Sequence, residues 1–387
     1  MSLKPWRDRY LVFGAPNFGA EERAALIACL DSGWVGSGPR VAELEERFGA
    51  YLGAGAAVAL NSGTAALHLA LLELRLEPGG EVITSPMTFC ATANAIIHAG
   101  LRPTFADCDR STQNLDPKAL ERAITPRTRA IVPVHFAGRP CDMDAIGAIA
   151  AAHDLRMVED CAHAIEATIR GRHCGTFGDF GCFSFYVTKN MTSVEGGMLT
   201  ARTREAAAPV KRRALHGMSA DAWRRFSDEG YVHYSVEEPG FKYNLTDLAA
   251  SLALVQLGHL EAWWRRRREL WELYLRELAE LPLVLPAPVA QDVRHGLHLF
   301  SCLIDDRHTR VSRDVVLRGL HELRIGAGVH YTALHLHPYY QKTFGYGRGD
   351  FPNAEWIGDR TFSIPLSSAV TDEDAADVVR ALRQLLS

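Results

Sequence analysis

Lys189 lies where an apolar, aromatic stretch gives way to a glycine-rich turn, in the sequence GCFSFYVTKNMTSVEGG at 181–197. The first part of this stretch predicts a buried strand, so we expect the lysine to be held partly away from water. Desolvation disfavours the charged ammonium and lowers its pKa, which leaves a nucleophilic amine. Such an amine can form a Schiff base with a carbonyl compound.

Two carboxylates and a histidine end another predicted buried strand, in VEDCAH at 158–163. A carboxylate there, such as that of Asp160, can hold a protonated ring nitrogen, as pyridoxal-phosphate enzymes require of the aspartate that keeps the coenzyme an electron sink. The alternative is an aspartate that only caps the next element. A metal site formed with His173 and Cys174 is disfavoured, because the spacing matches no standard site.

The sequence NSGTA at 61–65 separates an apolar strand from a helical pattern. Its amides and hydroxyls would open a helix N-terminus, which is a ready site for an anion such as phosphate. The alternative is a plain helix cap by Ser62 or Thr64. No Walker signature is present, and Gly53 and Gly55 lack the third glycine of a dinucleotide fingerprint. A lysine amine, a strand-end aspartate and a phosphate-binding helix start together indicate pyridoxal phosphate.

Three histidines in GVHYTALHLHPYY at 328–340 also suggest a metal site. Strand alternation would place His335 and His337 on one face, but Pro338 interrupts the strand and no carboxylate lies within the segment. Contact of one histidine with a substrate is favoured over metal binding. A Ser-His-Asp hydrolase is disfavoured, since the chain has no G-x-S-x-G elbow.

The elements that must position these residues alternate along the chain from about residue 40 to 200. Apolar β-like runs (AAVAL, EVITSP, RAIVPVHF and RMVED) are each followed by a helical pattern or a glycine-rich segment. This alternation predicts an α/β fold with a mostly parallel sheet flanked by helices. Ligands of such sheets bind at the carboxyl ends of the strands, where the candidate residues lie.

A long amphipathic helix is predicted at 247–281, leading into a second, smaller α/β domain. That domain contains strand-like HLFSCLID at 298–305 and helices at 312–323 and 371–386. We therefore predict a large cofactor-binding domain at 1–250 and a smaller one at 251–387. The arginine run 265–268 on the long helix is interpreted as a solvated face, because glutamates flank it.

Composition limits the partners that can be expected. The formal charge of −4 over 387 residues gives no reason to expect nucleic acid or an anionic membrane. The eight cysteines show no C-x-x-C spacing and predict reduced thiols in a cytoplasmic protein rather than a zinc site or a disulfide framework. No apolar run approaches the roughly 18 residues of a spanning helix.

Taken together, these motifs resemble the DegT/StrS family of nucleotide-sugar aminotransferases, which are pyridoxal-phosphate (PLP) enzymes of fold type I. The resemblance extends over nearly the whole chain and rests on SGWVGSGP, NSGTAALHLAL, VITSPMTF, PVHFAGRPCDMDAI, VEDCAHA, SFYVTKNMTSVEGG, GFKYNLTDLAASLALVQL and GVHY-x-x-LHLHPYY. KN-x-T-x-x-EGG and GFKYNLTD look closest to enzymes that aminate the 4-keto carbon of a UDP-sugar. Related sugar dehydratases have histidine at the position of Lys189.

The resemblance implies a catalytic role for three residues. Lys189 would form the internal aldimine and then move the proton between the cofactor carbon and the sugar carbon. Asp160 would pair with the pyridine nitrogen, and His163 would lie near the 3-hydroxyl of the ring. No metal is implied.

The resemblance also implies the remaining contacts. Phe89 stands where the family often has tryptophan or tyrosine, and its flat face would stack on the pyridine ring. Asn244 would reach the cofactor phosphate from the partner subunit of a homodimer. The other residues expected at the phosphate end of the cofactor are Gly63, Thr64, Ala65 and Ser184, and those expected at the sugar nucleotide are Trp34 and His335.

The expected reaction is amination of a nucleotide-linked 4-keto sugar, UDP- or dTDP-linked, in amino-sugar biosynthesis for a cell-surface polysaccharide. Glutamate is the usual amino donor in the family. Two alternatives remain open at this point. Relatives of the family aminate a free cyclitol ketone, and a homologue could bind the cofactor as a regulator without turnover.

Overall fold

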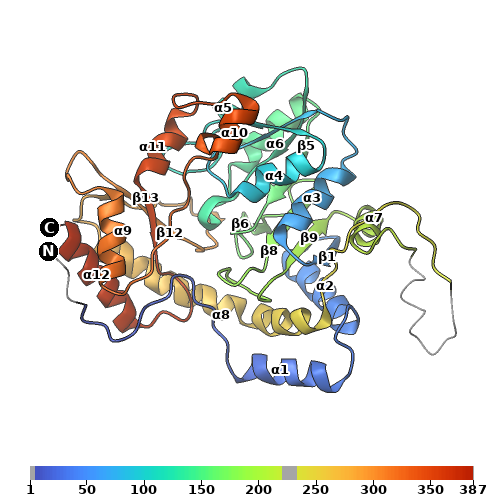
Figure 1. The fold of residues 1–387 in the computed structure, drawn as a ribbon, viewed down its shortest axis with the longest axis horizontal. Helices are drawn as coiled ribbons and strands as arrows, with labels where there is room; N and C mark the ends of the chain where they lie inside the picture. The colour runs from blue at the N-terminus through green and yellow to red at the C-terminus, as the bar shows by residue number, and fades with distance from the viewer. Residues whose placement is uncertain (1–4, 220–232, 387) are drawn as a thin grey trace.

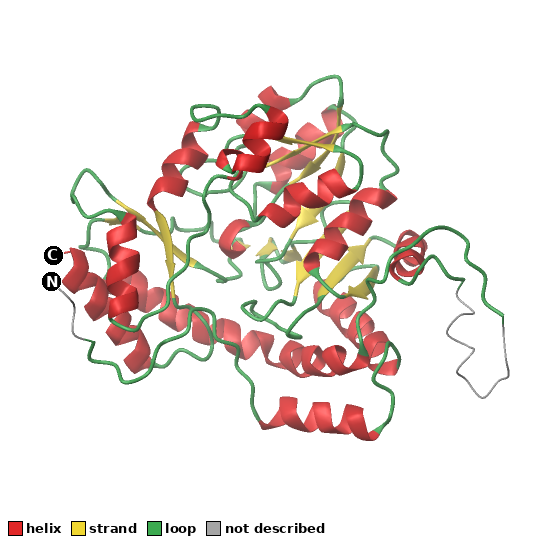
Figure 2. Cartoon of the chain, viewed as in Figure 1, coloured by secondary structure: helices red, strands yellow, loops and turns green. Residues whose placement is uncertain are grey.

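The computed structural model describes residues 5–219 and 233–386. A large sheet with helices on both sides forms one part of the molecule, and a smaller sheet with its own helices forms the other (Figure 2). Helix α8 (Asp247–Glu277) runs along both parts (Figure 1). The α/β class predicted from the alternating pattern is confirmed.

The large sheet has seven strands in the order β1-β9-β8-β5-β4-β2-β3. Strand β9 is antiparallel to both of its neighbours, whereas the pairs from β8 to β3 are all parallel, so the predicted mostly parallel sheet is confirmed. The strands are β1 (Ala56–Leu60), β2 (Glu81–Thr84), β3 (Arg102–Phe105), β4 (Thr128–Val132), β5 (Arg156–Asp160), β8 (Phe180–Ser184) and β9 (Gly197–Ala201). A separate small sheet is formed by β6 (Thr168–Ile169), β7 (Arg172–His173) and β11 (Val293–Arg294).

Alternate residues of each strand face opposite sides of the sheet and enter different cores. Val58 and Leu60 pack with α3, α4 and α7, whereas Ala59 packs with α2 and the first half of α8. Burial of both faces explains why these strands are short apolar runs without polar alternation. The helices of this part are α1 (Ala20–Asp31), α2 (Pro39–Leu52), α3 (Gly63–Glu73), α4 (Cys90–His98), α5 (Pro117–Ala123), α6 (Met143–Ala152) and α7 (Arg204–Ala214).

The C-terminal part has its own core, around an antiparallel sheet in the order β10-β12-β13. Early α8 residues such as Ala253 belong to the large core, and late ones such as Tyr274 belong to this second core, so α8 links the two. Trp6 and Leu11 also contact the second core, and the division at residue 250 stays a prediction. The elements are β10 (Leu283–Val284), β12 (Phe300–Ile304), β13 (Thr361–Ile364), α9 (Arg313–Glu322), α10 (Pro338–Phe344), α11 (Pro352–Arg360) and α12 (Asp372–Leu386).

The arginine run on α8 was predicted to be a solvated face, but the structure shows that it is not solvated throughout. Arg267 is only 2% exposed and forms a buried ion pair with Glu166, while Arg266 and Arg268 pair with carboxylates nearer the surface. Arg267 lies three residues before the buried Leu270, which puts both side chains on the inward face of the helix. In the described parts of the chain, no helix combines the length and apolar character needed to cross a bilayer.

Candidate active site

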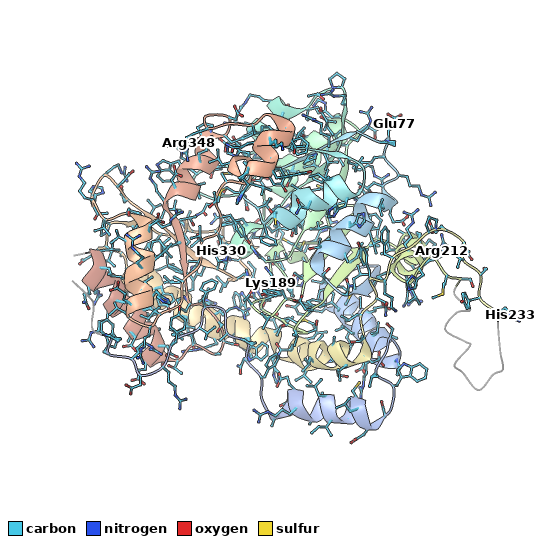
Figure 3. All side chains as sticks on the ribbon, viewed as in Figure 1. Glu77, Lys189, Arg212, His233, His330 and Arg348 are labelled. Atoms are coloured by element: carbon cyan, nitrogen blue, oxygen red, sulfur yellow. The ribbon has the colours of Figure 1, made fainter. Side chains whose placement is uncertain are left out.

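A cavity of about 600 Å³ opens where the predicted parallel strands end. Its walls include the last residues of β5 and β8, the starts of α3 and α4, and the segment around His298 and His330 from the C-terminal part. Lys189 and His330 lie near the middle of the molecule, between the large sheet and the C-terminal helices (Figure 3). The carboxyl ends of the strands therefore hold the pocket, as α/β sheets generally do.

Lys189 lies in the loop between β8 and β9 and lines this cavity. Its backbone amide donates to the carbonyl of Tyr186 over 2.9 Å, which closes a turn and presents the side chain to the pocket. Burial lowers the pKa of the Lys189 amine to about 8, although the carboxylate of Asp160 opposes the shift. A substantial fraction of this amine is therefore neutral near physiological pH, which makes it available as a nucleophile and a base.

The lowered pKa of Lys189 has a consequence for the stability of the cofactor-free protein. The folded pKa, about 8, lies below the ordinary value of 10.5, so the folded chain binds fewer protons between these limits and its stability rises with pH there. Lys189→Met keeps the apolar stem and should raise the free energy of unfolding at pH 7 by about 1–3 kcal/mol. Urea titrations from pH 7 to 10.5 should show this gap closing; a gap that widens with pH would contradict the shift.

Asp160 is the last residue of β5, and its carboxylate is buried at the floor of the cavity. One oxygen accepts a hydrogen bond from the hydroxyl of Thr92 (2.8 Å) and the other from the amide of Ala162 (3.1 Å). Burial raises the pKa of this carboxyl, against those two hydrogen bonds and the nearby Lys189. Among the described residues no cation forms a salt bridge with it, so a protonated ring nitrogen would compensate a carboxylate that the protein leaves unpaired.

Glu159, the other carboxylate of the motif, faces away from the cavity. It accepts hydrogen bonds from the amides of Gly175, Phe177 and Gly178, and it contacts the imidazole of His135 at 3.0 Å. These contacts fasten the turn that leads into β8. Because successive side chains of a strand point to opposite faces of the sheet, Asp160 lies at the pocket and Glu159 contributes to the structure around it.

The same cluster could be mistaken for a metal centre. Single ligand atoms of His135, Glu159 and Cys161 lie within 4.8 Å of one another. However, both Glu159 oxygens accept backbone amides, and the second ring nitrogen of His135 accepts from the amide of Cys141. Glu159 and His135 therefore already have protein partners, which argues for a structural role. His173, weighed earlier as a ligand, contacts the carbonyl of Ile165 instead.

The start of α3 provides an anion-binding end to the cavity. Ser62 caps the helix, and its hydroxyl accepts from the amide of Ala65 over 3.1 Å. Gly63 and Thr64 line the pocket, and their amides come before the first intrahelical hydrogen bond. Two donors and the positive end of the helix dipole therefore suit a phosphate here. A helix cap by Ser62 and a phosphate site at the same helix start were predicted as alternatives, and the structure is compatible with both.

Glycines keep the start of α3 close to the sheet. A Cβ atom on Gly63 would lie 3.0 Å from Cβ of Ser184, at the end of β8. A Cβ atom on Gly197 would lie 2.4 Å from the carbonyl carbon of Ser62, a contact with backbone that cannot move aside. Gly197 thus lets β9 approach the helix N-terminus, and Gly63 leaves room for Ser184 beside the free amides.

His163 and Phe89 also line the cavity. Nδ1 of His163 accepts from the amide of Ala137 (3.2 Å), so the neutral ring carries its proton on Nε2, which lies 3.3 Å from the hydroxyl of Tyr331. Burial, together with Lys189 and two further histidines, holds the pKa of His163 well below its ordinary value. Phe89 is 59% exposed and lies at the start of α4 with its ring 6.1 Å from that of Tyr331, free to stack on a flat ligand.

Four predicted site residues do not line this cavity. Ala65 is buried in the first turn of α3, where its amide donates to the hydroxyl of Ser62. Trp34 is exposed and donates to the carbonyl of Ser37, and the amide of Asn244 donates to the hydroxyl of the same serine. His335, expected at the sugar, is 0% exposed and is held 3.1 Å from the carboxylate of Glu355. The structure therefore places His335 in a buried pair, while the contacts expected of Trp34 and of a partner's Asn244 stay predictions.

Several cavity residues were missed by the sequence reasoning. Thr88 lies just before α4 and Thr92 lies in its first turn, and their hydroxyls contact each other at 2.7 Å beside Asp160. Their position after a predicted strand was a usable signal. His298 and Tyr331 come from the C-terminal part, and nothing in their spacing linked them to the lysine.

Comparison with known proteins identifies the family of the chain. Residues 16–383 match the model of the DegT/DnrJ/EryC1/StrS aminotransferase family. The spore coat polysaccharide biosynthesis protein SpsC of Bacillus subtilis is 46% identical over 381 residues, which is 98% of each chain.

Solved structures give the same result. Spr1654 of Streptococcus pneumoniae in its PMP form superposes with a TM-score of 0.91 at 30% identity, covering 97% of this chain and 98% of that one. The Helicobacter pylori enzyme PseC, an aminotransferase involved in the biosynthesis of pseudoaminic acid, gives 0.91 at 25% identity over 98% and 99% of the two chains. The chain belongs to the DegT/DnrJ/EryC1/StrS family and is a PLP-dependent sugar aminotransferase.

Proposed function

We propose that the enzyme transfers an amino group from glutamate to the C4 keto carbon of a nucleotide-linked sugar, with Lys189, Asp160 and His163 as its catalytic residues. The observation that carries this proposal is a single cavity that contains a lysine amine of lowered pKa, a buried unpaired carboxylate and free amides at a helix start. The names of SpsC and PseC, which refer to polysaccharide and amino-sugar biosynthesis, support a substrate of this class.

When bound, pyridoxal phosphate supplies a cationic ring that takes up the electrons of a cleaved C–H bond. The residues of the chain divide the remaining work. Asp160 would hold the proton on the ring nitrogen, and Gly63, Thr64 and Ser184 would bind the phosphate. The amine of Lys189 would move a proton between the cofactor carbon and the sugar carbon. Fixing the phosphate end keeps the reacting carbon beside that amine.

The proposal includes a cytoplasmic homodimer in which Asn244 of one subunit reaches the phosphate bound by the other. Two observations support it. Asn244 lies outside the lining of the cavity in its own chain. Tyr186 and Val194, on either side of Lys189 in the loop between β8 and β9, are 45% and 49% exposed and give a partner subunit an apolar surface to cover.

The test is transfer of isotope from [¹⁵N]glutamate by the purified, PLP-loaded enzyme. Four ketones would be compared: a UDP-linked and a dTDP-linked 4-keto sugar, the matching 3-keto sugar and a free cyclitol ketone. We expect ¹⁵N in the product of a nucleotide-linked 4-keto sugar, located at C4 by NMR. Amination of the cyclitol alone, or of the 3-keto sugar alone, would contradict the proposed substrate.

A further inference from the structure

His298 is a cavity residue with an unused polar atom. It lies just before β12, is 6% exposed and lines the same pocket as Lys189. Its ring centroid is 4.4 Å from that of His163, with 36° between the planes. Nδ1 of His298 lies 3.0 Å from Oδ1 of Asn190, and within the described chain Nε2 has no hydrogen-bond partner.

The side-chain orientation of Asn190 follows from its other contacts. Its amide nitrogen lies 2.9 Å from a carboxylate oxygen of Glu166 and 2.8 Å from the carbonyl oxygen of Gly296. Both of these atoms can only accept, so the reverse orientation would set oxygen against oxygen twice. The Asn190 oxygen must therefore face His298, which requires the proton of that imidazole to be on Nδ1.

A buried ion pair holds this arrangement in place. Glu166 is 0% exposed, and its other oxygen accepts from the guanidinium of Arg267, which is 2% exposed. Arginine stays charged in proteins, so its partner here is an acceptor-only carboxylate. Arg267, Glu166, Asn190 and His298 thus form one chain of hydrogen bonds, from α8 to the wall of the cavity.

The two neighbouring imidazoles therefore differ in hydrogen bonding: one Nε2 is an acceptor and the other is a donor. Burial, Lys189 and His330 hold the pKa of His298 well below its ordinary value, so the ring is neutral and its Nε2 is a hydrogen-bond acceptor. His163 has the other tautomer, because its Nδ1 accepts from Ala137, and it offers Nε2–H as a donor. The cavity wall therefore contains one acceptor and one donor nitrogen side by side.

We propose that His298 is a further substrate-positioning residue: its Nε2 accepts a hydrogen bond from an N–H or O–H group of the substrate, and the Arg267–Glu166–Asn190 chain keeps it an acceptor. The donor is either the ammonium group of the amino-acid substrate or a hydroxyl of the sugar. This inference rests on the proposed function only for the identity of these substrates.

Two variants separate the acceptor from the bulk of the side chain. His298→Asn keeps an N–H near the Nδ1 position for Asn190 but has no atom at Nε2, whereas His298→Gln can bring its carbonyl oxygen to that place. His295→Asn is the matched control, because His295 is a buried imidazole three residues away that packs against the ring of Trp271 and does not line the cavity.

Each half-reaction would be followed separately by single-turnover absorbance, with the amino acid or with the keto sugar. We expect His298→Asn to raise the half-saturating concentration about 10-fold in one half-reaction, as loss of one hydrogen bond predicts, and His298→Gln to restore most of it. An effect confined to the amino-acid half identifies the ammonium as the donor, and one confined to the sugar half identifies a hydroxyl. No change beyond that of His295→Asn, or equal loss in both His298 variants, would overturn the proposal.

A second measurement does not depend on turnover. In wild-type enzyme with ¹⁵N-labelled histidine, the signals that disappear in His298→Asn should show a protonated Nδ1 and an unprotonated Nε2 at pH 7. A protonated Nε2 would overturn the inference even if the kinetic arms agreed. If wild-type enzyme did not react with glutamate, the proposed donor would fail while this spectrum still decided the state of His298.

Discussion

Replacing Lys189 by alanine should lower transamination by about four orders of magnitude or more, because the variant loses the lysine amine that serves as both nucleophile and proton carrier, and no other described residue of the cavity lining is a lysine. The fold should survive. Among the described residues the amine makes no hydrogen bond, and the loop is held by backbone contacts such as the one from the Lys189 amide to Tyr186. Transfer of ¹⁵N from labelled glutamate measures the activity, and thermal melting measures the fold.

Two control variants test whether the loss of activity is specific to the Lys189 amine. Lys118→Ala changes an exposed lysine on α5 and should leave turnover within about twofold of wild type, as surface substitutions generally do. Lys189→Arg keeps a positive charge but supplies no neutral amine and should be inactive as well. An alanine variant with a tenth of wild-type activity would contradict the role assigned to Lys189.

The second large effect is expected for Asp160→Asn, with turnover falling about 100- to 1,000-fold because the charge that holds the ring-nitrogen proton is removed. The amide can keep both local contacts, since its oxygen can accept from the Ala162 amide and its NH₂ can donate to Thr92. Burial raises the pKa of the Asp160 carboxyl, which means that its ionised form destabilises the folded state at pH 7. The cofactor-free variant should therefore melt at or above the wild-type temperature.

Glu159→Gln is the contrast for Asp160→Asn. Glu159 is fully buried and accepts three backbone amides, so its loss should lower the free energy of unfolding by about 1–3 kcal/mol while leaving much of the turnover. The two variants should thus divide into one that is stable and inactive and one that is active and destabilised. The reverse division would contradict the placement of the two carboxylates.

Much of the scaffold could be predicted because its signals are local. Apolar runs bounded by small residues predicted β1, β2, β4 and β5, and the periodic pattern after residue 247 predicted α8. The rule that ligands lie at the carboxyl ends of parallel strands then brought Lys189, Asp160 and the start of α3 to one edge, and the structure places all three at one cavity. Their roles in the reaction remain predictions until tested.

The features that could not be predicted depend on contacts between distant parts of the chain. The position of β9 between β8 and β1 depends on its pairing with β1, which is far away in sequence. Arg267 is 101 residues from Glu166, and His298 is 108 residues from Asn190, so composition alone made the first look solvated and left the second unnoticed. The pairing of His335 with Glu355 could not be predicted for the same reason, because Glu355 belongs to α11.

The central claim is that Lys189 holds the cofactor. The most direct test is to reduce the PLP-loaded enzyme with borohydride, digest it and locate the pyridoxyl group by mass spectrometry. The account predicts the group on the peptide that contains Lys189, and its disappearance when glutamate is added before reduction. A pyridoxyl group on another lysine, or none in a protein that still transfers nitrogen, would contradict the account.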